Sequence, residues 1–417
     1  MLGEYQRDEA LIHFQRGLVL ERANRIEEAV EEYRRAVAHN PHLAEAHSAL
    51  GLYYRRQGLL AKAADEFRTV ANLADNFPAH FSLSGVLAEL GRYDEALAGL
   101  RRCLEFAPGD ATAHYEIAVI QFQRGDYRAA LAHLELAAPY FQDDWKVHHM
   151  LGSCHLRLCA YDESQAALEA ALRLAGHSAA KLYVADRLRA LARHREVGRP
   201  RGLKDQLYAE RGVALLGSAQ DDGLSVHECQ DYYFTYPDVA ATVGRLHAMA
   251  EGCGWGIGCV VAADRLAQPL AEALADALGV PQRRADEVRR GERALVMLAV
   301  GREAELLQLI AKRVLGPTIT FCLGLNWLRH SDALPDVSGI VARAACGVPW
   351  EAELRRLRAS GAPALAVEDC LARAAAEIAV ALAEAGPEPS IAEQVRYYRE
   401  RRGLRFIDRS MIERPAQ

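Results

Sequence analysis

Apolar residues in the first 178 positions repeat with a period of 34 residues, shortened once to 33. One slot holds a small residue in every period: Ala29, Ala63, Ala96, Ala130 and Ser164. A bulky residue follows each of them four positions later: Tyr33, Phe67, Leu100, Leu134 and Leu168. A period of this length predicts stacked helical hairpins, none of which can bury its apolar face alone. Such stacks form a concave surface that more often docks partners than carries out catalysis.

Each period divides into two helices. In the first period we expect helices near residues 11–23 and 26–39. The residues between paired helices favour a left-handed turn, and they are Asn24, Gly58, Gly91 and Gly125. Pro41 and Pro108 then mark ends of second helices, because proline cannot continue the helical hydrogen-bond ladder.

The five periods resemble the tetratricopeptide repeat (TPR) family over residues 10–178. The likeness rests on a small residue in the first helix of each period, together with the alanine and bulky slots of the second. The first-helix residues are Gly17, Gly51, Ser84, Ala118 and Gly152. The resemblance implies an α-solenoid of five hairpins, wound as a right-handed superhelix, that holds a peptide or a partner helix in its groove.

By the same resemblance, the groove is lined mainly by the first helix of each hairpin. The slots that face inward combine aromatic residues with arginine, a mixture enriched at interaction hot spots. The predicted partner-binding residues are Phe14, Arg55, Arg56, Phe81, Tyr115, Phe122, His149 and Arg157. Packing between hairpins is the alternative role for the aromatic members. Phe14 and Leu18 stand where carboxylate-clamp repeats have lysine and asparagine, which argues against capture of a chain terminus.

From about residue 213 the pattern changes to short apolar runs that alternate with amphipathic stretches. Strands are predicted near residues 259–263, 294–300, 318–325 and 337–342. Helices are predicted near residues 265–278, 302–314, 350–359 and 367–385. This alternation predicts an α/β domain over residues 213–385, with a mainly parallel sheet covered by helices.

Two further segments flank this domain. Residues 179–212 contain a stretch with eight basic and two acidic residues, at positions 181–204, and are interpreted as a capping helix and connector. Residues 386–417 are expected to form a basic helix and a tail, and Ser390 with Glu393 has the spacing of a capping box. Nucleic-acid binding through these basic helices is a weaker alternative, because few aromatic residues accompany the charges.

Polar residues follow the predicted strands, where ligands of parallel sheets bind. The speculative ligand-binding residues are Asp264, Arg265, Arg302, Asn326 and His330. They could hold a small anion, although ordinary strand-to-helix turns have a similar composition. Residues 225–345 also weakly resemble a degenerate type I phosphoribosyltransferase. The two acids that this family places at its second strand end correspond here to Leu298 and Ala299.

Composition narrows the choice of function. The chain has 417 residues, 51% of them hydrophobic and 25% charged, and a net charge of -6, which does not favour polyanion binding by the whole chain. No apolar run predicts a membrane span, and residues 1–10 do not have the pattern of a secretory signal. The nine cysteines have neither zinc-ligand nor disulfide-framework spacing, so we expect reduced thiols in the cytoplasm, no metal and no cofactor.

The sequence thus predicts a protein-interaction adaptor or scaffold with a non-catalytic α/β domain, and it assigns no catalytic residue. The alternative is an enzyme, phosphoribosyltransferase-like or otherwise specific for sugar phosphates or nucleotides, whose repeats recruit its substrate. That alternative requires Asp264, Arg302, Asn326 and His330 to converge on one pocket.

Overall fold

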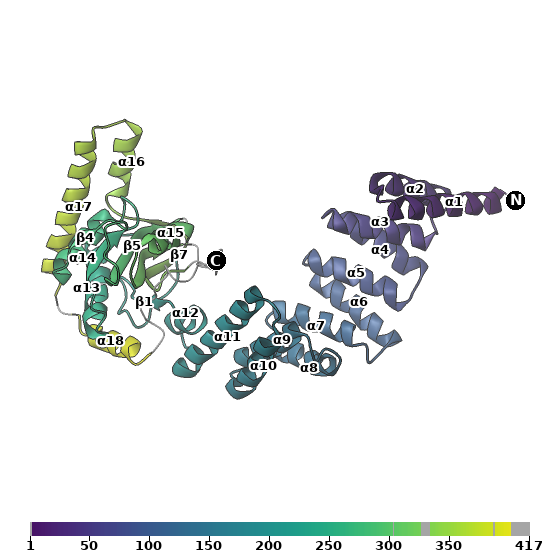
Figure 1. The fold of residues 1–417 in the computed structure, drawn as a ribbon, viewed down its shortest axis with the longest axis horizontal. Coiled ribbons are helices and arrows are strands. Elements are labelled where there is room, and N and C mark those ends of the chain that lie inside the picture. The colour runs from purple at the N-terminus through teal and green to yellow at the C-terminus, as the bar shows by residue number, and fades with distance from the viewer. Residues whose placement is uncertain (1, 303, 327–333, 387, 402–417) are drawn as a thin grey trace. The chain divides into compact units, whose positions relative to one another are not determined.

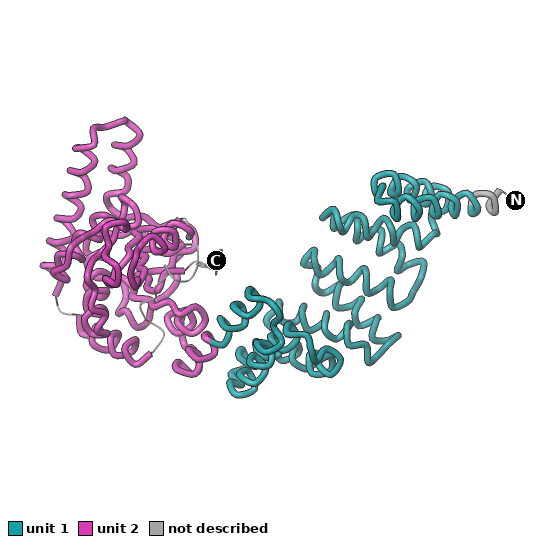
Figure 2. Tube along the Cα trace, viewed as in Figure 1, with its two compact units in different colours: residues 1–188 teal, residues 189–417 magenta. Residues whose placement is uncertain are grey.

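The computed structural model describes residues 2–302, 304–326, 334–386 and 388–401. The chain divides into two compact units, residues 1–188 and residues 189–417 (Figure 2). Each unit has its own core and is described separately.

The first unit is a run of helical hairpins (Figure 1). Its helices pair in chain order: α1 (Leu2–Arg22) with α2 (Ile26–His39), α3 (Ala44–Arg56) with α4 (Leu60–Leu73), α5 (Phe77–Glu89) with α6 (Tyr93–Phe106), α7 (Ala111–Gln123) with α8 (Tyr127–Ala137), and α9 (Trp145–Arg157) with α10 (Tyr161–Leu174). A short 3₁₀ helix, η1 (Ala138–Tyr140), follows α8. Helix α1 begins at Leu2 rather than near residue 11, because residues 2–10 have good helix propensity although they lack an apolar stripe.

The small residue on each first helix lets the second helix approach closely. A Cβ atom built on Gly51 would lie 2.9 Å from the Phe67 ring, and Gly17 and Gly152 meet Tyr33 and Leu168 in the same way. Ser164 fits the alanine slot because its hydroxyl donates a 2.7 Å hydrogen bond to the Gly152 carbonyl. The sequence period therefore reflects the packing of the second helix on the first within each hairpin.

The turns have the predicted left-handed backbone. Asn24 has a φ of 58°, and Gly58, Gly91 and Gly125 have φ values of 70° to 80°. Cys159, with a φ of 62°, takes this position in the last hairpin. The positive φ ends each first helix and reverses the chain.

A histidine recurs on the first helix of each hairpin, a pattern that the sequence analysis did not identify. The five residues are His13, His47, His80, His114 and His148. Nδ1 of His13 lies 2.7 Å from Glu32, and Nδ1 of His47 lies 2.6 Å from Glu66, both on the second helix of the same hairpin. These polar contacts tie the two helices together beside the apolar core.

Residues 178–211 form two helices instead of one capping helix. Helix α11 is Ser178–Val197, and α12 is Leu203–Arg211. Gly198, with a φ of 72°, and Pro200 interrupt the helix between them. The boundary between the compact units falls within α11, after Leu188.

The second unit contains a parallel sheet. Its strands are β1 (Ala214–Leu215), β2 (Cys229–Tyr233), β3 (Cys259–Ala262), β4 (Gln282–Arg283), β5 (Ala294–Gly301), β6 (Thr318–Leu325) and β7 (Val337–Gly347). Their order is β1-β7-β6-β5-β3-β4, and β2 pairs with the second part of β7, beyond the end of β1. Every pairing is parallel, so the strands end at the same edge of the sheet.

Helices cover both faces of this sheet (Figure 1). Leu295, Met297 and Ala299 of β5 pack toward α13 (Tyr236–Gly252), α14 (Gln268–Leu278) and α17 (Ala364–Glu384). The alternate residues of β5 pack toward α15 (Ala304–Arg313) and Leu207 of α12. Helix α16 (Glu351–Ala359) packs on α17, and α18 (Ile391–Arg399) packs on α13.

The predicted strands and helices of this unit are present, and all of them except β6 have ends that differ from the prediction. Three strands were not predicted: β1 and β4 have only two residues each, and β2 has the mixed sequence Cys-Gln-Asp-Tyr-Tyr. The predicted capping box at Ser390 is wrong, because Ser390 makes no side-chain cap hydrogen bond and has helical backbone angles. A capping box instead begins α13, where Thr235 and Asp238 bond reciprocally.

Candidate interaction groove

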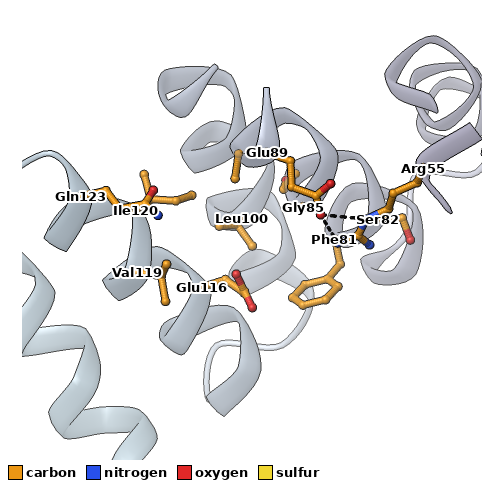
Figure 3. Close-up of a pocket in the computed structure, with 12 residues that line it drawn as sticks. Arg55, Phe81, Ser82, Gly85, Glu89, Leu100, Glu116, Val119, Ile120 and Gln123 are labelled. Atoms are coloured by element: carbon orange, nitrogen blue, oxygen red, sulfur yellow. Dashed lines mark hydrogen bonds and ion pairs between the residues drawn. The ribbon is translucent and has the colours of Figure 1, made fainter. Parts of the chain in front are cut away.

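Three successive first helices, α3, α5 and α7, line a cavity of about 410 Å³ in the solenoid (Figure 3). Phe81, Gly85 and Ala88 lie along one face of α5, and Glu116, Val119 and Gln123 lie along one face of α7, since helical neighbours are three or four residues apart. Arg55 comes from the last turn of α3, and the second helix α6 adds Leu100. The wall combines apolar residues with three charged ones, Arg55, Glu89 and Glu116.

Arg55 and Glu89 form an ion pair across this cavity (Figure 3). Arg55 Nε and Nη2 lie 2.9 and 2.5 Å from the same Glu89 oxygen, and both side chains remain about two-fifths exposed (42% and 41%). Gly85 lies directly beside this pair, since a Cβ built on it would be 3.7 Å from the Arg55 guanidinium, an ordinary van der Waals distance. The pair therefore joins neighbouring hairpins while facing solvent.

Glu116 adds a second carboxylate to the wall. Burial raises the pKa of Glu116, and the nearby Glu89 raises it further, whereas Arg55 opposes both effects. At neutral pH Arg55 supplies one positive charge against the two carboxylates. The cavity thus combines an apolar surface with one excess negative charge and suits a ligand that carries a cationic group.

The structure brings only two of the eight predicted partner-binding residues, Arg55 and Phe81, into this cavity. Tyr115 and Phe122 lie on α7, three or four residues from Val119, and are partly buried against a neighbouring core cluster, with their ring centres 5.9 Å from Phe141 and 5.3 Å from Tyr127. They do not line this cavity, and their role in partner binding stays a prediction.

The other four predicted residues also lie outside the cavity. Phe14 packs against the first core, with its ring 5.7 Å from Tyr33. Arg56 pairs with Glu21 at 3.6 Å, and the Arg157 guanidinium lies 5.9 Å from the Tyr127 ring centre.

His149 packs on Tyr183, with their ring centres 4.8 Å apart. Burial, assisted by Arg187, lowers the pKa of His149 to about 4. The ring is therefore neutral at physiological pH, and it contributes packing instead of charge.

The sequence analysis missed the two carboxylates, Glu89 and Glu116. Both could have been found from spacing: Glu89 lies 33 residues after Arg56, in the same slot of the next period, and Glu116 lies one helical turn before Val119. Neither was predicted, because the composition of interaction hot spots favours aromatic residues and arginine.

In the second unit, Arg302 and Asn326 line one cavity of about 520 Å³ at the strand ends, as expected of neighbouring parallel strands. Asp264 does not line it; its carboxylate instead accepts a 2.8 Å hydrogen bond from the Ala267 amide, and burial raises its pKa. Arg265 pairs with Glu368 at 3.5 Å. His330 lies outside the described residues. Glu351 and Arg355, which the sequence analysis did not select, also line this cavity.

Comparison with known proteins identifies the first unit. Two tetratricopeptide-repeat family models match residues 14–80 and 87–154, so the N-terminal half contains TPR repeats. No curated protein matches the chain. No match supports the phosphoribosyltransferase resemblance of the C-terminal half, and we do not retain it.

Solved structures of low identity match 40–46% of the chain. YrrB, a TPR protein with an unusual peptide-binding site, is 18% identical, with 44% of this chain and 94% of that chain covered and a TM-score of 0.40. MamA from Desulfovibrio magneticus RS-1 is 23% identical, with 40% and 93% covered and a TM-score of 0.37. PilF from Pseudomonas aeruginosa is 21% identical, with 46% and 87% covered and a TM-score of 0.38.

Within the described residues, no helix has both the length and the apolar character needed to cross a membrane.

Proposed function

We propose that the chain is a protein-interaction adaptor whose five TPR hairpins hold a partner segment against α3, α5 and α7. The observation that carries this proposal is the cavity whose walls come from the first helices of successive hairpins. Its apolar residues can bury side chains of a peptide or helix, and its charged residues can fix their register.

The charges suggest what the segment contains. Glu116 lines the apolar wall, and Glu89 is already paired with Arg55. A lysine or arginine of the partner could reach Glu116 while its aliphatic stem packs on Phe81 or Val119. We therefore expect a segment in which an apolar residue lies close to a basic one.

The α/β unit has a non-catalytic role in this proposal, and the site of action is the cytoplasm. All nine cysteines are free thiols, and six of them are buried. A reducing compartment keeps such thiols in this state. The adaptor would then present its α/β unit to a second partner or to a small ligand.

The proposal is tested with peptides selected on the full chain from a displayed random library. The dissociation constant of a selected peptide is measured by fluorescence anisotropy for the unaltered chain, Gly85→Leu and Arg55→Ala. Gly85→Leu fills the cavity without removing a charge, so we expect a loss of affinity of about tenfold or more. Arg55→Ala removes the ion-pair partner of Glu89 and makes the net charge of the cavity more negative.

Arg68→Ala is the matched control. Arg68 lies on the second helix α4, pairs with Asp65 at 2.9 Å and is 37% exposed, close to the 42% of Arg55. We expect its affinity to equal that of the unaltered chain. Equal affinity in Gly85→Leu, or an equal loss in the control, would place binding outside the cavity and contradict the proposal.

A further inference from the structure

The strand-end cavity of the second unit contains two arginines arranged around one buried carboxylate. Arg302 follows β5, and Arg355 and Glu351 lie on α16. The Glu351 side chain is only 10% exposed, and one of its oxygens contacts both guanidinium groups. From this geometry we infer that the cavity binds a small oxyanion, either a phosphate group or a carboxylate.

The charges at this site do not cancel. Arg302 and Arg355 supply two positive charges, and Glu351 supplies one negative charge. Both guanidinium groups remain accessible, since the arginine side chains are 43% and 66% exposed. An oxyanion therefore meets an excess positive charge beside a partly buried wall, where electrostatic attraction is screened less than in bulk water.

Both arginines have hydrogen-bond donors that the contacts with Glu351 do not use. Each guanidinium has five N–H groups, and the contacts with Glu351 use Nη2 of both residues. Nη2 of Arg302 also donates to the Cys346 carbonyl at 3.4 Å. The remaining edge of each planar group can form paired hydrogen bonds with an oxyanion, the geometry in which arginine is strongest.

Glu351 orients both arginines. A surface arginine loses side-chain entropy when it is fixed on a ligand, and a pre-existing ion pair reduces that loss. The contact with Arg355 is 2.5 Å, and both arginines share the same carboxylate oxygen. Glu351 is thus a positioning residue, and the two arginines are the groups that touch the anion.

The fold places this cavity where parallel sheets bind ligands. β2, β5, β6 and β7 all end at this edge, and the residues that line the cavity follow or end these strands. After β3 the chain continues to β4 on one side, whereas after β5 it continues to β6 on the other side. Arg302 therefore borders the point where the connections diverge, and the cavity itself opens on the side of β6 and β7.

The floor of the cavity is kept open by glycine. A Cβ built on Gly347 would lie 3.1 Å from the Tyr233 ring and 3.4 Å from Glu351. The volume of about 520 Å³ exceeds that needed for a bare phosphate and allows a small organic group to accompany the anion. Asn326 can donate an amide hydrogen from the end of β6.

Isothermal titration calorimetry on the full chain tests this inference, with phosphate and malonate as separate probes at constant ionic strength. Arg302→Gln and Arg355→Gln each remove one cation. Arg373→Gln is the matched control, because Arg373 is also 66% exposed and pairs with a glutamate of α16, Glu353, but does not line the cavity. Arg302→Lys retains the charge and removes the planar fork.

We expect saturable binding of phosphate or malonate, which identifies the kind of anion. Each glutamine variant should weaken binding about tenfold or more, Arg302→Lys should weaken it less, and the Arg373 control should leave it unchanged. Circular dichroism confirms that the variants are folded. Failure of both probes to bind, or equal binding by the folded glutamine variants, would overturn the inference. Neither result bears on the solenoid groove, because every residue tested lies in the second unit.

Discussion

The two units build their cores from contacts of different range. In the solenoid, Gly51 packs against Phe67, 16 residues later, and the same spacing recurs in other hairpins. In the α/β unit, the Tyr398 hydroxyl bonds to the backbone of Leu215, 183 residues away. A period in the sequence can reveal the first kind of contact, whereas the second depends on the complete topology.

The same difference affects how each unit can unfold. A hairpin of the solenoid contacts mainly its neighbours, so damage to one hairpin acts mainly on that hairpin and on the hairpins beside it. The α/β unit is held together by contacts between segments that lie far apart in the sequence. Loss of one such contact therefore lowers the stability of the whole unit. The mutations below are chosen to separate these two kinds of response.

The largest effect is expected from Arg245→Met in the α/β unit. Arg245 is 1% exposed; its Nε lies 2.8 Å from Glu388 and its Nη1 lies 3.1 Å from Asp221. Removing one partner of a buried ion pair leaves the opposite charges unpaired, so we expect a loss of about 3–5 kcal/mol in the free energy of unfolding. Urea denaturation followed by tryptophan fluorescence reports on this unit, where three of the four tryptophans lie.

Arg343→Met is the control for that variant. Arg343 pairs with Glu228 at 2.7 Å but is 54% exposed, so we expect a change of about 1 kcal/mol or less. Equal effects of the two variants would show that burial does not govern these ion pairs.

A smaller effect is expected from Gly51→Ala in the solenoid. The added methyl group would lie 2.9 Å from the Phe67 ring, so the two helices must separate, and we expect a loss of about 1–3 kcal/mol. Gly85→Ala is the matched change on α5, where the nearest atom is 3.7 Å away, and we expect a gain of about 0.5–1 kcal/mol from helix propensity. Thermal unfolding at 222 nm measures both. A loss in both variants would contradict the packing role of the period.

The stability of the solenoid should also depend on pH. The His149 pKa is about 4 in the folded chain, against an ordinary value near 6.5. Protonation is therefore easier in the unfolded chain. The contribution of neutral His149 is fully present above pH 6.5 and is lost as the pH falls toward 4, with a total effect of about 1–3 kcal/mol on the solenoid.

His149→Phe keeps an aromatic ring against Tyr183 and cannot titrate. Urea denaturation of the solenoid at several pH values should give a shallower slope between pH 6.5 and 4 for this variant. His133, whose pKa is also lowered by burial, continues to titrate and leaves part of the slope. An unchanged slope would exclude His149 as its source.

The smallest effect is expected from Glu116→Gln on peptide binding. The variant removes one negative charge from the groove and retains its shape, so affinity for a basic peptide should fall by about two- to tenfold, and the dependence on salt should weaken. Anisotropy titrations at low and high salt measure both changes.

The raised pKa of Glu116 adds a second expectation: in the unaltered chain this charge is lost on acidification at a higher pH than for an ordinary glutamate, and binding weakens with it. Binding that is tighter in the variant would indicate an acidic partner.

The solenoid could be predicted in detail because each contact repeats locally. The hairpins, their turn residues and the packing slots follow from the positions of Ala63, Phe67 and their equivalents. The beginning of α1 was less predictable. Helix propensity, without an apolar face, extends this helix to Leu2. Of the predicted partner-binding residues, Arg55 and Phe81 line the cavity, whereas Tyr115 and Phe122 are partly buried beside it, and a binding role for any of them stays a prediction.

The strands of the α/β unit were predictable only where they are buried on both faces. The exact bounds of β6, Thr318–Leu325, follow from its continuous apolar run. By contrast, β2 has the mixed sequence Cys-Gln-Asp-Tyr-Tyr and is a strand because β7 lies beside it. Pairing with β2 also extends β7 beyond residue 342 to Gly347, next to the anion cavity. Local sequence patterns could not identify Glu351 or Arg355 as residues of this cavity, because only the complete sheet brings α16 to that edge.

Hydrogen–deuterium exchange of the full chain, with and without a selected peptide, tests the central claim that the first helices of the solenoid bind a protein segment. Bound peptide should slow amide exchange in α3, α5 and α7, and it should leave exchange in residues 189–417 unchanged. Slowed exchange confined to α4, α6 and α8, or to the second unit, would contradict the claim.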